Sequence, residues 1–253
     1  MGCPVLPRFS LSLLLCAAAG VGRLGAQAEP VQIVPQAPVR SLRWWDGAAA
    51  AGGISLLILV DLPVRTFVQE HRSGDLDGVS ATVRHFGEWP FFAGVPAALL
   101  LAGLATGHHR VTGAGVRTAA TSGASIVLVL GLKQLLGRER PSHHGGSPAD
   151  FDGVGGEGSF PSGHATMAFA LAASLADEIR NPWATAGLYT AAGAVAWSRV
   201  NDNYHWLSDV VAGALLGTAT ARVVNGRWRI FGWTPPTVSL GHSGASLAWQ
   251  LRL

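Results

Sequence analysis

Two polar residues toward the C-terminus of this 253-residue chain, His205 and Asp209, have the types and spacing of a catalytic pair. Side chains four residues apart lie on one face of a helix, so the carboxylate can hold one ring N–H of the imidazole. The other ring nitrogen is then available as a base or a nucleophile. Taken alone, the pair fits a solvated ion pair better than a catalytic one, so its interpretation depends on the other motifs.

The segment Pro161-Ser162-Gly163-His164 comes directly before an apolar stretch and predicts the start of a helix. At that position Ser162 can cap the helix, and the backbone N–H groups and the positive end of the helix dipole favour an anion. Plain helix capping explains the segment about as well as anion binding does.

Three basic residues, Lys133, Arg140 and Arg199, lie beside apolar segments, and Lys133 is the only lysine in the chain. The guanidinium of arginine can form two parallel hydrogen bonds, and the ammonium of lysine is a point charge. Both groups suit phosphate oxygens. Considered singly, each residue would be interpreted as an anchor at a membrane interface.

Together these segments read K-x6-R-P, P-S-G-H and S-R-x5-H-x3-D, in that order along the chain. The combination resembles the signature of the type 2 phosphatidic acid phosphatase superfamily, which also includes bacterial class A acid phosphatases and vanadium haloperoxidases. The resemblance covers about residues 45–225, and no motif position departs from the pattern.

The resemblance implies that His205 attacks phosphorus and becomes phosphohistidine, while Asp209 orients the ring and stabilises its charge. It implies that His164 protonates the leaving oxygen and then activates the water that releases phosphate. Neither a metal nor another cofactor is expected. Tyr204 and Trp206 flank His205, and we expect them to pack. The groups implied to hold the phosphoryl oxygens are Lys133, Arg140, Ser162, the backbone N–H of Gly163, and Arg199.

Six uncharged apolar stretches must position these motifs, and they are too long for ordinary strands. They predict an all-α fold with a six-helix core bundle. The segment 66–88 is amphipathic and predicts a surface helix, and the link 137–160 predicts a loop. The tail 236–253 alternates weakly and predicts a short C-terminal β-hairpin. The six stretches are Gly47–Val60, Trp89–Gly107, Thr118–Leu132, Ala165–Ala176, Asn181–Ser198 and Val210–Ala221.

Charged residues make up 13% of the chain, against about 25% in an average soluble domain. That composition excludes intrinsic disorder and favours a transmembrane bundle over a soluble one. A membrane span needs roughly 17–25 apolar residues, and between charges only the second and fifth stretches are that long. The others become long enough if charges such as Asp46, Asp61 and Arg222 lie at the interface. The sequence contains no run of basic residues, which argues against nucleic-acid binding.

The chain divides into a predicted signal peptide (1–28), a linker (29–44), the helical domain (45–225) and a C-terminal tail (226–253). The signal prediction rests on Arg8, an apolar run, and the small-x-small pattern Ala26-Gln27-Ala28. Arginine placement puts the three motifs on the periplasmic side of a bacterial-type inner membrane. A cleaved signal conflicts with six spans, so a soluble exported protein remains the alternative location.

These observations predict a phosphatase that hydrolyses a phosphomonoester or pyrophosphate, with a phosphorylated lipid as the favoured substrate. A phosphate ester other than a lipid is the alternative substrate. The membrane is the expected partner. The alternatives within the same superfamily are a soluble secreted acid phosphatase and a vanadate-dependent haloperoxidase. The sequence sets neither the particular substrate nor the oligomeric state.

Overall fold

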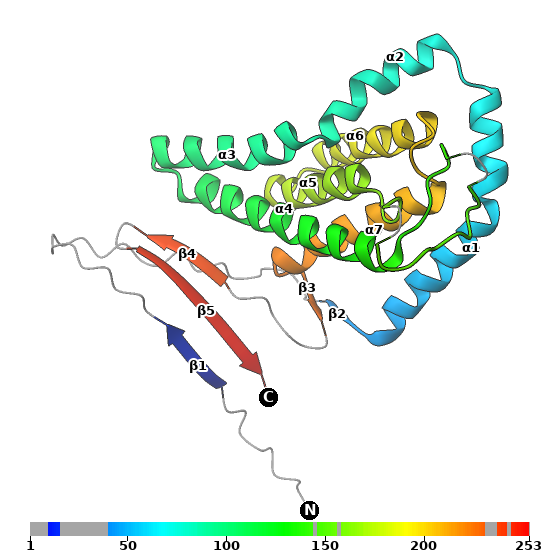
Figure 1. Ribbon diagram of the computed structural model, residues 1–253. Helices are drawn as coiled ribbons and strands as arrows, with labels where there is room; N and C mark the ends of the chain where they lie inside the picture. The colour runs from blue at the N-terminus through cyan, green and yellow to red at the C-terminus, as the bar shows by residue number, and fades with distance from the viewer. Residues whose placement is uncertain are drawn as a thin grey trace, which may run out of the picture.

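Seven α-helices make up most of the computed structural model, which describes residues 10–15, 40–143, 146–155, 158–230, 237–241 and 244–252 (Figure 1). Each of the six apolar stretches forms the body of one helix, which confirms the predicted helical fold. The helices are α1 (Trp44–Glu70), α2 (Gly74–Val83), α3 (Trp89–Thr106), α4 (His109–Leu136), α5 (Gly163–Ile179), α6 (Pro182–Asn201) and α7 (Leu207–Val224).

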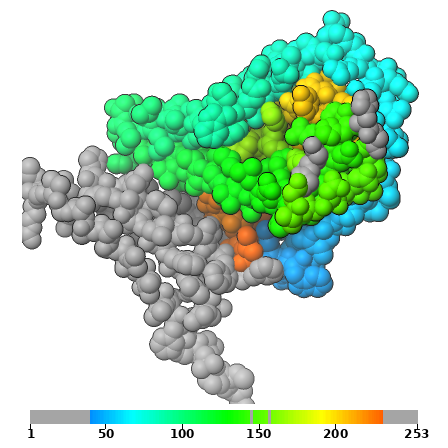
Figure 2. Space-filling model, viewed as in Figure 1, coloured from blue at the N-terminus to red at the C-terminus, as the bar shows by residue number. Residues whose placement is uncertain are grey.

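The amphipathic segment 66–88 forms a surface helix over only part of its length. Its first residues complete α1, and α2 then begins after Ser73, whose hydroxyl accepts a hydrogen bond from the backbone N–H of Leu76 at 3.3 Å. A short 3-10 helix, η1 (Arg84–Gly87), leads from α2 into α3. The described residues of the link between α4 and α5 form no helix, in line with the predicted loop, and cover one end of the bundle beside α1 (Figure 2).

Helix α5 lies between α4, α6 and α7 at the centre of the bundle (Figure 1). Its buried face consists mainly of alanines, which let neighbouring helices approach closely. Helix α7 uses glycines for the same purpose. A Cβ atom on Gly213 would lie 2.6 Å from the carbonyl oxygen of Ser162, and one on Gly217 would lie 2.1 Å from that of Thr166. These contacts hold the first turns of α5 and α7, which carry two of the motifs, against each other.

The strands lie outside the helical region of the sequence. Strands β4 (Thr237–Gly241) and β5 (Gly244–Arg252) form the antiparallel hairpin predicted for the tail, and β1 (Ser10–Leu15) pairs with β5. Strand β2 (Arg40–Leu42) pairs in parallel with β3 (Trp228–Ile230), joining the segment before α1 to the segment after α7. Most of the predicted signal peptide and linker lies outside the described residues, so those boundaries stay predictions.

Four of the described helices, α1, α3, α4 and α7, are long and apolar enough to cross a membrane. Helices α5 and α6 are not among them. The fifth stretch has the length predicted for a span, but α6, with 20 residues, is not apolar enough in mean hydropathy. Large exposed apolar side chains on α1, α3 and α4 give the bundle the surface of a membrane protein. They include Leu56, Leu59, Leu101, Leu104, Val127 and Leu130.

Two charges expected at the membrane interface are instead paired with other side chains of the bundle. Asp61 is fully buried and lies 2.7 Å from the guanidinium of Arg138. Arg222 pairs with Asp177, whose other carboxylate oxygen accepts a hydrogen bond from Asn225 at 3.0 Å. A buried charge is tolerated when it has a partner, and sequence reasoning had no means to identify partners so distant along the chain.

Candidate active site

The three motifs meet at one end of the bundle, although they come from four different helices and the links between them. Lys133 lies in the last turn of α4 and Arg140 in the link that follows. Ser162, Gly163 and His164 begin α5, and the backbone N–H of Ser162 donates to the carbonyl oxygen of Asp209 at 3.0 Å. Arg199 lies near the end of α6 and Asp209 in the first turn of α7. His205 lies two residues before α7 begins, so the pair meets at the helix N-terminus and not along one helical face as its spacing predicted. All eight predicted residues are therefore brought together.

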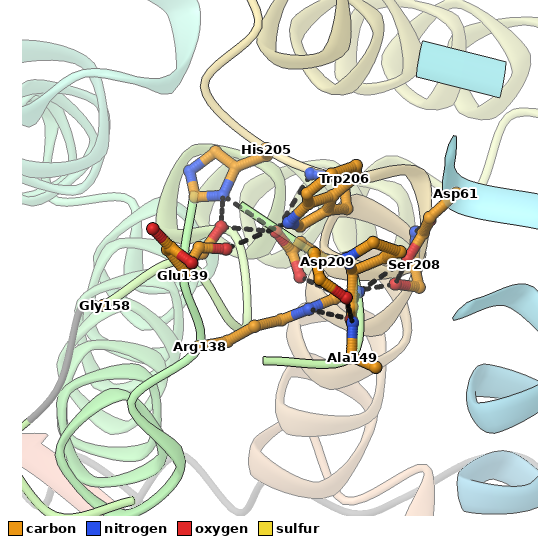
Figure 3. Close-up of polar contacts among 12 residues, drawn as sticks. Asp61, Arg138, Glu139, Ala149, Gly158, His205, Trp206, Ser208 and Asp209 are labelled. Atoms are coloured by element: carbon orange, nitrogen blue, oxygen red, sulfur yellow. Dashed lines mark hydrogen bonds and ion pairs between the residues drawn. The ribbon is translucent and has the colours of Figure 1, made fainter. Parts of the chain in front are cut away.

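The His205–Asp209 pair is buried, which argues against the solvated ion pair. The side chains are 6% and 0% exposed, and Nδ1 of His205 lies 3.4 Å from Oδ2 of Asp209 (Figure 3). That same oxygen accepts hydrogen bonds from the Ser159 hydroxyl at 2.6 Å and from the backbone N–H of Trp206 at 3.0 Å. Because Nδ1 faces the carboxylate, the Nε2 nitrogen is on the opposite edge of the ring.

The sequence interpretation missed two residues behind this pair, Arg138 and Asp61. The guanidinium of Arg138 donates to Asp209, to Asp61 at 2.7 Å and to the hydroxyl of Ser208 at 2.7 Å (Figure 3). The other Asp61 oxygen accepts the backbone N–H of Ser208 at 2.8 Å. An acidic residue inside an apolar stretch is itself a signal of a functional site, and Asp61 could have been singled out on that ground.

Two of the three motif cations, Lys133 and Arg199, are held in place by contacts outside the His205–Asp209 pair. The ammonium of Lys133 donates to the carbonyl oxygen of Gly158. Arg199 pairs with Asp202 at 2.9 Å, and Asp202 in turn accepts a hydrogen bond from the Ser80 hydroxyl at 2.6 Å. These contacts fix the direction of the two charges before any anion binds.

The aromatic residues beside His205 have different roles. Trp206 is buried, as expected of a packing residue, and its indole N–H donates to the carbonyl oxygen of Glu139 at 2.9 Å. Tyr204 was expected to pack, yet it is 48% exposed. Its ring centroid lies 5.0 Å from the guanidinium carbon of Arg199 and 5.7 Å from that of Arg140. The ring thus lies close to two of the predicted phosphate ligands.

Ser162 occupies the N-cap position of α5, but its side chain does not cap the helix. Its hydroxyl is buried and has no hydrogen-bond partner within the described part of the chain. A buried hydroxyl normally finds a partner, and this one lies where the first N–H groups of a helix point outward. That arrangement fits an anion better than it fits plain capping.

Both imidazoles are held neutral near pH 7. Burial lowers the pKa of His205, and this outweighs the hydrogen bond to Asp209, which favours the charged ring. Burial and the neighbouring charge of Arg199 lower the pKa of His164 to about 4, while Glu88 opposes that shift. A neutral His205 can act as a nucleophile, and the negative charge of a bound phosphate would raise the pKa of both rings.

Within the described ranges, no three His, Cys, Asp or Glu side chains come together as a metal site. What the motifs assemble is a buried His–Asp pair, a second imidazole and three cations at one end of a helical bundle. Groups of these types can bind a phosphate and supply a nucleophile for it.

The sequence of residues 114–230 matches the model of the PAP2 superfamily, and this segment contains all three motifs. The matched segment covers somewhat less than half of the chain. Two solved structures share its fold: LpxE from Aquifex aeolicus (TM-score 0.52, 23% identity, 65% of this chain and 94% of that one), and a PAP2-type phosphatidylglycerolphosphate phosphatase from Bacillus subtilis (TM-score 0.56, 20% identity, 71% and 94%).

Two curated proteins are similar over shorter segments. A lipid A 1-phosphatase from Porphyromonas gingivalis is 44% identical over 61 residues, which is 23% of this chain and 14% of that protein. An acid phosphatase from Zymomonas mobilis subsp. mobilis is 34% identical over 77 residues, which is 30% of this chain and 28% of that protein. The similarity thus spans less than a third of either relative.

Proposed function

We propose that this protein is a phosphatase that removes phosphate from a phosphorylated lipid through a phosphohistidine intermediate. The observation that carries the proposal is the buried His205–Asp209 pair, set beside His164 and the three motif cations. The match of residues 114–230 to the PAP2 superfamily model supports the reaction class.

In the first step, Nε2 of neutral His205 attacks phosphorus and the bond from phosphorus to the leaving oxygen breaks. His164, which takes up a proton when the phosphate dianion raises its pKa, gives that proton to the leaving oxygen. In the second step, neutral His164 takes a proton from water as the water oxygen attacks phosphorus. The phosphorus–nitrogen bond breaks, and inorganic phosphate and free His205 are regenerated.

Asp209 holds the Nδ1–H of His205 and stabilises the positive charge that the ring acquires on phosphorylation. Lys133, Arg140 and Arg199 supply the positive charge that the equatorial oxygens need in the transition state. The hydroxyl of Ser162 and the backbone N–H of Gly163 add neutral donors. This route draws all its charge from the chain's own residues.

A lipid substrate is supported by the four helices that are apolar enough to cross a membrane. The name of the P. gingivalis relative, a lipid A 1-phosphatase, points the same way. The arginine distribution supports an active site on the periplasmic side. A soluble exported acid phosphatase is the second candidate, favoured by the predicted signal peptide and by the Z. mobilis relative.

Phosphate release by the detergent-purified protein tests the proposal. The panel includes lipid A, phosphatidate, phosphatidylglycerophosphate and polyprenyl pyrophosphate, with p-nitrophenyl phosphate as the water-soluble comparison. We expect release from at least one lipid and loss of that release in His205→Ala with the melting temperature retained. Activity of His205→Ala at the wild-type rate would refute the nucleophile. Extraction from membranes by alkali without detergent would favour the soluble candidate.

A further inference from the structure

We propose that Asp61 is a positioning residue that neutralises Arg138, so that Asp209 keeps its full negative charge for His205. The proposal rests on the proposed function and concerns the same site. It assigns a role in catalysis to α1, which carries none of the three motifs.

The geometry places one cation between two carboxylates. Arg138 bonds Asp61 through one terminal nitrogen and Asp209 through the other, and all three side chains are 0% exposed. Ser208 bridges the group, because its hydroxyl bonds both Arg138 and Asp61 (Figure 3). One positive and two negative charges leave the buried group with one net negative charge.

Arg138 is needed in this place for a reason unrelated to Asp209. Its guanidinium donates to the carbonyl oxygen of Pro148 at 3.0 Å, and its own carbonyl oxygen accepts the N–H of Ser159 at 2.9 Å. The guanidinium therefore ties Pro148 to the start of the link that carries Arg140, while the bond to Ser159 comes from the backbone of residue 138. Without a second carboxylate, that structural arginine would neutralise Asp209.

Asp61 also fixes the start of α7. The first N–H groups of a helix lack partners within the helix, and the side chain of Trp206 at the N-cap has no oxygen that could accept one. The N–H of Ser208 is instead bonded by the Asp61 carboxylate from another helix at 2.8 Å. The next residue is Asp209. Asp61 on α1 therefore positions the Asp209 carboxylate and also balances the positive charge of the Arg138 that is paired with it.

The other groups that face His205 make this negative charge necessary. Lys133 from α4, Arg140 from the link after it and His164 from α5 all disfavour a positive charge on the ring. Asp209 is the group that favours it. If Asp61 were neutral, the Arg138–Asp209 group would have no net charge, and the phosphorylated imidazolium would be less stable.

The test compares pH profiles of kcat for Asp61→Asn, Arg138→Gln and the double variant on the lipid that the wild type hydrolyses. In Asp61→Asn the pKa of His205 falls, so the acid limb moves to lower pH by about one unit, and kcat falls about tenfold. In Arg138→Gln the acid limb moves the opposite way. In the double variant Asp209 again supplies one net negative charge, so the limb returns to its wild-type position.

Asp177→Asn is the matched control, because Asp177 is also a buried carboxylate paired with an arginine, but at the other end of α5. We expect it to lower the melting temperature without moving the limb. Equal limbs in Asp61→Asn and Asp177→Asn would overturn the proposal. If Asp61→Asn does not fold, the double variant provides the test, since removing both members of a buried ion pair is often tolerated. An acid limb displaced from the wild-type position in the double variant would refute the proposed charge balance. An inactive wild type would instead refute the proposed function.

Discussion

Substituting Gly217 on α7 with alanine tests whether the close packing of α7 on α5 positions the active site. The new Cβ would lie 2.1 Å from the carbonyl oxygen of Thr166 and 2.9 Å from the backbone nitrogen of Ala170. Both are backbone atoms of α5, so no side chain can rotate away. Since real Cβ atoms essentially never come within 3.0 Å of such atoms, the two helices must separate by about 1 Å.

Overpacking of this kind costs about 1–3 kcal/mol, and each kcal/mol lowers the melting temperature of a chain of this size by about 2–4 °C. The same movement separates Asp209 on α7 from His164 on α5. A misplacement of about 1 Å costs up to about 100-fold in rate, and Gly217 lies two turns from Asp209. We therefore expect kcat of Gly217→Ala to fall about 10- to 100-fold.

The assay is phosphate release on the preferred lipid, together with thermal unfolding in the same detergent. Gly187→Ala on α6 is the control, because no atom outside its own helix lies within 4 Å of the new Cβ. There we expect unchanged kcat and equal or higher stability, since alanine is the better helix former. Wild-type kcat in Gly217→Ala would show that the separation of α5 and α7 does not set the active-site geometry.

Two further substitutions probe the edges of the site. In Glu88→Gln the negative charge that raises the pKa of His164 is lost. His164 should then lose its proton at a lower pH, and the basic limb of the kcat profile should move to lower pH. An unmoved limb contradicts this coupling. In Tyr204→Ala the ring beside Arg140 and Arg199 is removed. Each cation–π contact contributes about 0.5–1 kcal/mol at an exposed site, so KM should rise several-fold, whereas Tyr204→Phe should retain the wild-type KM.

The helices and the motif positions were predictable from sequence because both are local properties. Long uncharged runs such as Trp89–Gly107 favour helices, because a helix satisfies its backbone hydrogen bonds within the run itself. The order and spacing of the motifs around Lys133, His164 and His205 can likewise be read directly from the sequence. The structure brings these three motifs together.

Other properties depended on partners far away in sequence. Asp61 was expected at the membrane interface, yet it is fully buried, and its partner Arg138 lies 77 residues further along the chain. Tyr204 was expected to pack, but its ring lies at the surface beside two guanidinium groups. No spacing rule connects such residues, because burial and pairing are decided by which helices become neighbours.

The amino-acid sequence by itself determined which segments are helical and which residues could do phosphoryl chemistry, because composition and spacing act over a few turns. Only the tertiary structure decided how the charges are balanced. It buried His205 beside Asp209, gave Arg138 a second carboxylate, and left the Ser162 hydroxyl without a partner in the described part of the chain. The free energy of a buried charge depends on the atoms around it in space, and those atoms come from helices that only folding brings together.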